Sequence, residues 1–306
     1  MENRQVMKDR GQYWLLLPAG LAFAWLVSKA QWFWNHNPEL SFGWVVVMLC
    51  GFLFWDASET RPPFDFRWRL LGILPGALGL GWLFFVQLYQ AAYGSNAASA
   101  QGLAMGVFAL VAANLMLAFG WPGLRHYAFA FFFIWLALPL PSAVLNLVIS
   151  NLQHGIAAAN VEILNLAGIP AQKRGSLVQL ANCVVGIDEA CSGIRSLQST
   201  VMATLFIGYL TLKNNSLRLT LLVGGVCLAI VGNLIRSLYL SITAHNHGVE
   251  AIKSVHDQAG WTILVFTVVG VALGSWALGH LEKMLQQLST QSTEPQPLAP
   301  GPDAGS

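Results

Sequence analysis

The stretch LLGILPGALGLGWLFFVQLYQ, residues 70–90, decides the fold class, because it is apolar and carries no charged side chain. It belongs to a longer region, residues 70–124, that lacks Asp, Glu, Lys and Arg, and residues 258–281 lack them too. A membrane-spanning helix needs ~20 consecutive, mostly apolar residues. The whole chain is 55% hydrophobic and 10% charged, whereas soluble domains carry about 25% charged residues. The sequence therefore predicts an all-α, polytopic membrane helix bundle.

Eight apolar segments are predicted to span the membrane: residues 12–34, 42–55, 70–90, 102–119, 127–149, 192–212, 219–240 and 260–281. The first resembles a signal peptide, but the chain behind it is itself membrane-embedded, so we expect an uncleaved first span. We expect residues 1–285 to form one transmembrane domain. Residues 286–306 are rich in Ser, Thr, Gln and Pro and are predicted to be a disordered cytoplasmic tail.

The basic residues predict the orientation, because cytoplasmic loops carry an excess of Lys and Arg. With the N-terminus inside, ten fall on the cytoplasmic side: Arg4, Lys8, Arg10, Arg61, Arg67, Arg69, Arg125, Lys213, Arg218 and Lys283. The outer side receives Lys29, Lys173, Arg174 and Lys253. We therefore expect a protein of the inner membrane whose two termini both lie in the cytoplasm.

The long outer segment between the fifth and sixth predicted spans is neither uniformly apolar, like a span, nor uniformly polar, like a short loop. Residues 144–167 are apolar but interrupted by polar side chains, which indicates an amphipathic or re-entrant helix at the outer interface. Gly168-Ile169-Pro170 is expected to end it. Residues 175–185 alternate enough for a short extended piece, and Lys173-Arg174 is predicted to be a solvated turn.

Several kinds of chemistry are disfavoured by composition. The basic residues form no patch, so nucleic acid is not an expected partner. The four cysteines show no metal-binding spacing, and we predict neither a metal nor a cofactor. Cys50 and Cys227 lie in apolar runs and are expected to be core residues, while Cys183 is expected to be structural.

A nucleophile is predicted at Cys191, where the sixth apolar segment begins. A free thiol with a pKa of about 8.5 needs a helix N-terminus or a nearby cation to become a thiolate at neutral pH. Cys191 precedes a predicted helix, and Arg195 lies one turn further on the same face. The alternative is a buried structural cysteine, but Glu189, Ser192 and Arg195 do not suit an apolar pocket. These three residues are predicted to support the site or bind substrate.

Arg236 is the predicted oxyanion stabiliser, placed one turn before the outer end of the seventh span. An ionisable group at membrane depth is costly, so its default interpretation is functional. Asn233 lies one turn before it and extends a polar stripe, which an interfacial, snorkelling arginine would not require. Arg195 is an alternative for the oxyanion role, or for docking a substrate carboxylate.

His256 is the predicted general acid and base, placed shortly before the eighth span, with an ordinary pKa of about 6.5. Asp257 or Glu189 is a candidate to orient it. The alternative is a solvated loop histidine, an interpretation that fits His245 and His247 better.

The blocks EACSGIRSL (189–197), NLIR (233–236) and HDQAGW (256–261) resemble those of the exosortase/archaeosortase family of membrane-embedded cysteine transpeptidases. The resemblance implies eight spans and an outer-face site in which Cys191, Arg236 and His256 are catalytic. It also implies partners: exported proteins bearing a C-terminal sorting signal, made of a short motif such as Pro-Glu-Pro, a transmembrane helix and a basic tail. An amine or glycan acceptor would give transfer, and water would give cleavage.

Two other functions remain as alternatives. A transporter or permease would place polar groups such as Arg236 at mid-helix depth and would show internal pseudo-symmetry, which the sequence lacks. A non-catalytic assembly factor for export would tolerate replacement of Cys191.

Overall fold

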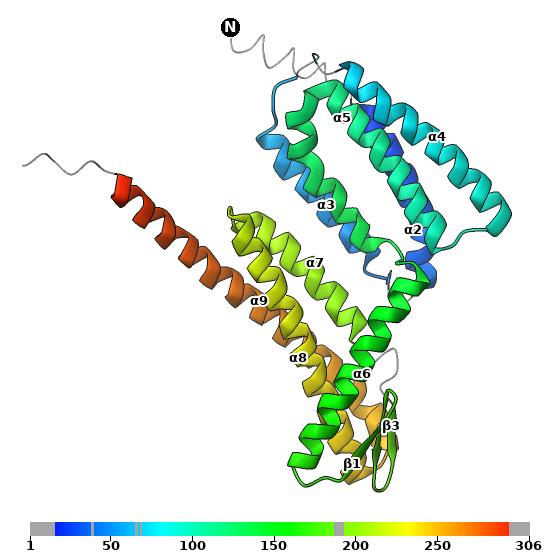
Figure 1. The fold of residues 1–306 in the computed structure, drawn as a ribbon, viewed down its shortest axis with the longest axis vertical. Helices are drawn as coiled ribbons and strands as arrows, with labels where there is room; N and C mark the ends of the chain where they lie inside the picture. The colour runs from blue at the N-terminus through cyan, green and yellow to red at the C-terminus, as the bar shows by residue number, and fades with distance from the viewer. Residues whose placement is uncertain (1–15, 38–39, 65–66, 68, 187–192, 294–306) are drawn as a thin grey trace, which may run out of the picture. The chain divides into compact units, whose positions relative to one another are not determined.

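The computed structural model describes residues 16–37, 40–64, 67, 69–186 and 193–293. These residues are almost entirely helical, which confirms the all-α class, and they divide into two compact units, Met1–Val148 and Ile149–Ser306 (Figure 1). The single catalytic domain over residues 1–285 stays a prediction.

Before the start of α6, the described part of the first unit contains the helices α2 (Leu17–His36), α3 (Gly43–Glu59), α4 (Arg69–Tyr93) and α5 (Ala97–Phe133) and the short 3-10 turn η3 (Ile134–Ala137). Helix α5 reverses at Gly120, whose φ of 68° and ψ of −161° are non-helical, so its two halves form a hairpin (Figure 1). Only glycine adopts this backbone conformation readily. The reversal lies between the predicted fourth and fifth spans.

The predicted fifth span is wrong in its second half. The helix stops at η3, and residues 138–141 are not helical. Pro139 and Pro141 explain the break, because proline lacks the backbone N–H and restricts the residue before it. A new helix, α6 (Ser142–Leu166), starts directly after them.

Helices α4 and α5 pack closely through small residues. A Cβ on Gly79 would lie 2.9 Å from the Ala109 Cβ, and one on Gly76 would lie 3.3 Å from the Ala113 Cβ. Without a hydrophobic driving force in lipid, membrane helices associate through such close backbone approach. Gly72, Gly76 and Gly79 of residues 70–90 thus have a packing role.

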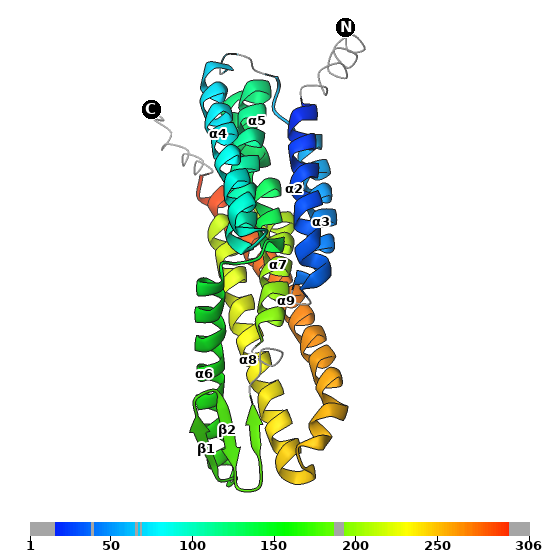
Figure 2. The ribbon, with the colours of Figure 1, turned by 90° about the vertical axis from the view of Figure 1, so that its right-hand side faces the viewer.

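The second unit contains α6, the strands β1 (Ala171–Arg174), β2 (Leu177–Leu180) and β3 (Val184–Gly186), and the helices α7 (Ile194–Thr211), α8 (Asn215–His247) and α9 (Glu250–Thr293) (Figure 2). The strands form an antiparallel sheet in the order β1-β2-β3. The predicted helix at 144–167 is confirmed as α6. The single extended piece is corrected to three strands, and Lys173 and Arg174 lie in β1 with exposed side chains rather than in a turn.

The sheet packs on α6 and on the end of α8 through a buried apolar cluster: Ile156, Ala157, Val161, Leu164, Ala171, Val178, Leu180, Val185 and Ala244. The Asn165 side chain bonds both the N–H and the carbonyl of Ala171 at 2.9 and 3.0 Å, which ties α6 to β1. Asn182 donates to the His245 carbonyl at 2.8 Å. The sheet therefore belongs structurally to the end of α8 that follows Arg236.

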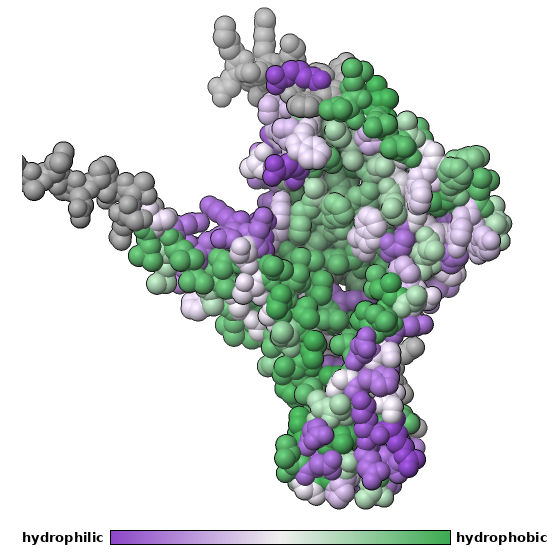
Figure 3. All heavy atoms as spheres, in the orientation of Figure 1, coloured by the Kyte–Doolittle hydropathy of each residue, from purple (hydrophilic) through white to green (hydrophobic). Residues whose placement is uncertain are grey.

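Among the described residues, four helical stretches are long and apolar enough to cross a membrane: Leu70–Tyr93, Ala97–Ala137, Asn215–His247 and Gln258–Ser289. Their exposed side chains are largely apolar, as Figure 3 shows along the helices of the second unit. Cys50 is buried as predicted, but Cys227 is exposed on α8, so that prediction is wrong. Helix α9 continues to Thr293, so residues 286–293 are helical rather than disordered.

Candidate active site

The three predicted catalytic residues are described to different extents. Cys191 lies outside the described residues, as do Glu189 and Ser192. The backbone of Arg195 lies in the first turn of α7, and the backbones of His256 and Asp257 lie in α9, but their side chains are outside the description. Arg236 and Asn233 are described in full, on α8.

The cysteine segment meets α8 at Gly193, two residues after Cys191. Gly193 is the N-cap of α7 and has a left-handed backbone, with a φ of 79°. A Cβ at this position would lie 2.6 Å from both Cγ and Nδ2 of Asn233. The backbone at Gly193 is thus in direct contact with the Asn233 side chain, so two of the three sequence blocks touch.

The arginine meets α9 close to the histidine block. A Cβ on Gly260 would lie 3.7 Å from Nη2 of Arg236 and 3.9 Å from its Cζ. Gly260 follows His256 by four positions in α9, and residues four apart share one face of a helix. The guanidinium of Arg236 therefore packs against the α9 face that also carries position 256.

These contacts lie at one level of the α7–α8–α9 bundle. The opposite end is marked by the α7–α8 turn, where the Glu282 carboxylate of α9 accepts hydrogen bonds from the backbone N–H groups of Lys213 and Asn214. Arg236 follows Asn215 by 21 positions and Gly260 precedes Glu282 by 22. At about 1.5 Å per residue, both lie ~32 Å from that turn. This is close to the ~30 Å hydrocarbon thickness of a bilayer.

Three details of the predicted placement need correction. Helix α8 continues to His247, so Arg236 lies eleven positions before its end rather than one turn. His256 lies inside α9, which begins at Glu250, and not in an aqueous link before a helix. His245 and His247 occupy the last turn of α8 instead of a loop. Helices α8 and α9 are therefore longer than a membrane span requires.

A buried polar cluster beside Arg236 was not anticipated from the sequence. Asn160 of α6 is fully buried and donates from Nδ2 to the hydroxyls of Ser237 and Ser241, at 2.7 and 3.0 Å. Ser237 is the residue after Arg236, so the cluster fixes α6 on the helix that positions the guanidinium. Asn160 could be noticed in the sequence because it interrupts an apolar run. Its hydrogen-bond partners could not be predicted from the sequence.

The start of α7 also contains polar atoms in the interior. Ser196 Oγ and Gln198 Oε1 are buried and have no hydrogen-bond partner within the described part of the chain. Buried polar atoms are normally satisfied, so such atoms call for an explanation. Both lie within seven positions of Cys191 and are additional candidates for contact with a polar ligand or water.

The thiol of Cys183 differs from the nucleophile expected at Cys191. Cys183 precedes β3 and packs against the apolar cluster of the sheet. Burial raises the pKa of the Cys183 thiol, so it is a poorer nucleophile at neutral pH than an ordinary cysteine. A structural role for Cys183 therefore fits its surroundings.

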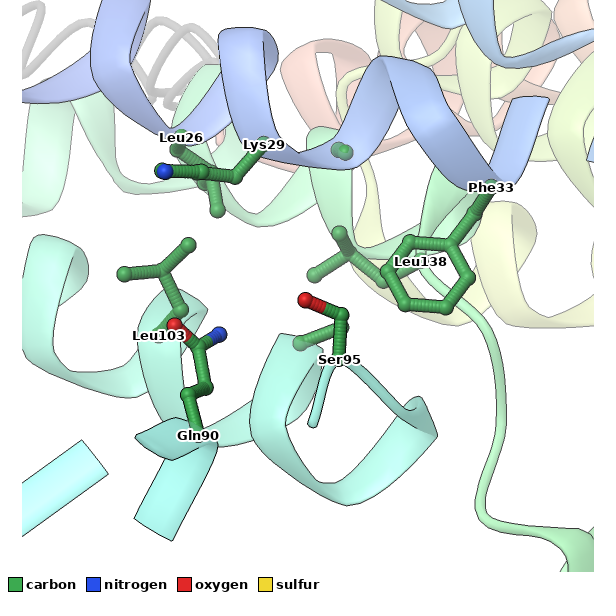
Figure 4. A pocket seen from close by; sticks show the side chains of 9 residues that line it. Leu26, Lys29, Phe33, Gln90, Ser95, Leu103 and Leu138 are labelled. Atoms are coloured by element: carbon green, nitrogen blue, oxygen red, sulfur yellow. The ribbon is translucent and has the colours of Figure 1, made fainter. Parts of the chain in front are cut away.

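A separate hollow exists in the first unit, among α2, the end of α4 and the start of α5. Figure 4 shows Lys29 and Phe33 above it, with Gln90, Ser95, Leu103 and Leu138 around it. Its volume is about 30 Å³, which is enough for a water molecule but not for a peptide. It is not a substrate site of the size that peptide chemistry needs.

The fold and the apolar helices define a multi-pass membrane protein with a polar cluster where the start of α7 meets the inner parts of α8 and α9. The model of the transmembrane exosortase family (Exosortase_EpsH) matches residues 34–273, which is more than three quarters of the chain. The chain therefore belongs to the exosortase family. No curated protein and no solved structure shows a significant match.

Proposed function

We propose that this protein is a cysteine peptidase or transpeptidase that cleaves the C-terminal sorting signal of exported proteins at the outer face of the inner membrane. The observation that carries the proposal is the meeting of the three blocks: Gly193 packs on the Asn233 side chain, and the Arg236 guanidinium lies beside Gly260, within van der Waals reach of a Cβ at that position. Residues far apart in sequence thus approach one another at one level of the bundle. Membership of the exosortase family supports the same interpretation.

The proposed reaction has two steps. The Cys191 thiolate attacks the scissile carbonyl carbon, Arg236 stabilises the oxyanion, and the C–N bond breaks as His256 gives a proton to the leaving amine. A thioester remains on Cys191. His256 then removes a proton from an amine, a sugar hydroxyl or water, which attacks the thioester and restores the thiolate.

The remaining predicted residues have supporting roles. Asn233, held against Gly193, positions the segment that carries the nucleophile. Asp257 or Glu189 orients the imidazole of His256, and Ser192 borders the nucleophile. Arg195 competes with Arg236 for the oxyanion or binds a substrate carboxylate, because a guanidinium forms bidentate bonds with carboxylates.

The decisive experiment co-expresses the protein with an exported substrate that carries a candidate sorting signal. Processing should disappear in Cys191→Ala, Arg236→Ala and His256→Ala while membrane levels of the protein hold. Matched controls remove the same side-chain types elsewhere: Cys227→Ala on α8, Arg174→Ala on β1 and His154→Ala on α6. The controls should process normally.

Two results would reject the proposal. Normal processing by Cys191→Ala would make the protein an assembly factor rather than the enzyme. Labelling of Cys191 by an impermeant maleimide only after the cells are opened would place the site on the cytoplasmic side. The mass of the released product then distinguishes hydrolysis from transfer to an amine or a glycan.

A further inference from the structure

A second site lies at the opposite end of the same three helices. A groove of about 500 Å³ runs between α9 and the α7–α8 turn. Its walls include Thr211, Lys213, Trp276, His280 and Lys283. We propose that this groove binds a phosphate group, and that the phosphate is the headgroup of an anionic phospholipid. The proposal is independent of the catalytic function.

The charge of the groove is set by its lysines rather than by its one acidic wall residue. Glu282 is only 8% exposed, and its carboxylate accepts hydrogen bonds from the Lys213 N–H at 3.0 and 3.1 Å and the Asn214 N–H at 2.6 Å. These bonds hold the turn against α9 and satisfy the carboxylate internally. The ammonium groups of Lys213 and Lys283, both on exposed residues, therefore give the groove its net positive charge.

The groove leaves room for a ligand beside Gly279, which is one of its lining residues. A Cβ built on Gly279 would find nothing within 4 Å, and we call this open space the base of the groove. The Thr211 and Ser275 hydroxyls bond each other at 2.8 Å and join α7 to α9 along the same wall. The Thr211 hydroxyl also donates to the Ile207 carbonyl at 2.7 Å, so the donors that face a ligand here are the ammonium groups of Lys213 and Lys283. Ammonium groups beside an open base suit a compact, multiply accepting anion such as phosphate.

The surroundings favour a lipid over a soluble phosphate. Trp276 is 65% exposed on α9 and packs against the His280 ring with centroids 4.6 Å apart, and Leu281, Leu285 and Leu288 are exposed on the same helix. Tryptophan at the end of an apolar helix marks the lipid–water interface. Figure 3 shows a hydrophilic patch over the α7–α8 turn next to hydrophobic α9. A headgroup in the groove would leave its acyl chains along the apolar side chains.

The test measures lipid binding by native mass spectrometry on the full-length protein in a zwitterionic detergent, with phosphatidylglycerol and phosphatidylcholine at equal concentrations. Phosphatidylglycerol should bind at least tenfold more tightly. Each lysine near an anionic lipid contributes about fivefold, so Lys213→Gln with Lys283→Gln should weaken binding roughly 20-fold. The control, Lys173→Gln with Arg174→Gln, makes the same change of charge on β1 and should leave binding unchanged.

A second variant keeps the test independent of charge. Gly279→Leu fills the base of the groove, should fold because the space is open, and should also abolish the preference for phosphatidylglycerol. Equal binding of the two lipids by the wild type would overturn the proposal, and so would an equal loss in the control pair. If millimolar inorganic phosphate displaces the lipid completely and stabilises the protein as well as the lipid does, the lipid assignment is wrong.

Discussion

Replacing Gly193 by alanine tests the contact on which the active site depends. The left-handed backbone at this position, with a φ of 79°, costs a residue with a Cβ about 1–2 kcal/mol. The new methyl would also lie 2.6 Å from Cγ and Nδ2 of Asn233, and overpacking of this kind costs about 1–3 kcal/mol. Gly193→Ala should therefore destabilise the protein by roughly 2–5 kcal/mol, from the sum of both effects.

Gly168→Ala is a matched control, because it isolates the backbone effect. Gly168 has a φ of 80°, and a Cβ added to it would meet nothing within 4 Å, so only the cost of the left-handed conformation applies. The assay is thermal unfolding of both variants in the same detergent. At about 2.1 cal/mol/K of unfolding entropy per residue, the difference of about 1–3 kcal/mol corresponds to ~2–5 °C in Tm for a chain of 306 residues. The double variant Gly193→Ala with Asn233→Ala should recover most of this difference.

Equal unfolding temperatures for Gly193→Ala and Gly168→Ala would refute the reasoning. That result would mean that the segment after Cys191 does not pack on Asn233, and the meeting of the blocks would lose its main support. Failure of the double variant to recover stability, with the single variants behaving as expected, would locate the clash elsewhere.

Three further predictions concern stability and reactivity. Asn160→Leu leaves two serine hydroxyls buried without their donor and should cost about 1–3 kcal/mol in thermal unfolding, and adding Ser237→Ala and Ser241→Ala should recover part of it. Glu282→Ala removes the acceptor for two backbone N–H groups and should lower the free energy of unfolding by about 2–4 kcal/mol. Glu282→Gln should lower it less, and thermal unfolding measures both variants. In a variant with Cys183 as the sole cysteine, the rate of maleimide labelling should reach half of its maximum above pH ~8.5, because burial raises the pKa of the thiol; a half-maximum at or below that pH would contradict this.

Much of the fold could be predicted from the apolar segments of the sequence and from the polar residues that interrupt them. The charge-free stretch at residues 70–90 predicted a span, and α4 occupies it. The helix at 144–167 was predicted from an apolar run with polar interruptions, and α6 is there. The break after η3 was missed because hydropathy does not distinguish a continuous apolar helix from two helices separated by prolines.

The site was predictable in composition but not in contacts. Asn233 and Arg236 were singled out because polar groups are rare in apolar helices, and that reasoning needs no structure. Which backbones touch them depends on glycines, at Gly193 and Gly260, whose role in close approach is visible only when the helices are placed together. Asn160 was likewise visible as an interruption, but its serine partners lie 77 and 81 positions away.

The lengths of the last helices relate the level of the polar residues to the thickness of a bilayer. Helix α8 has 33 residues and is about 50 Å long, whereas a bilayer core is ~30 Å thick. With the α7–α8 turn at one membrane surface, Arg236 reaches the other surface, and the last eleven residues of α8 project beyond it. There they pack against α6 and the sheet. A thioester formed at this level would meet water or a soluble acceptor, while a transmembrane substrate helix would remain in lipid. This level supports the proposed reaction on a membrane-anchored peptide.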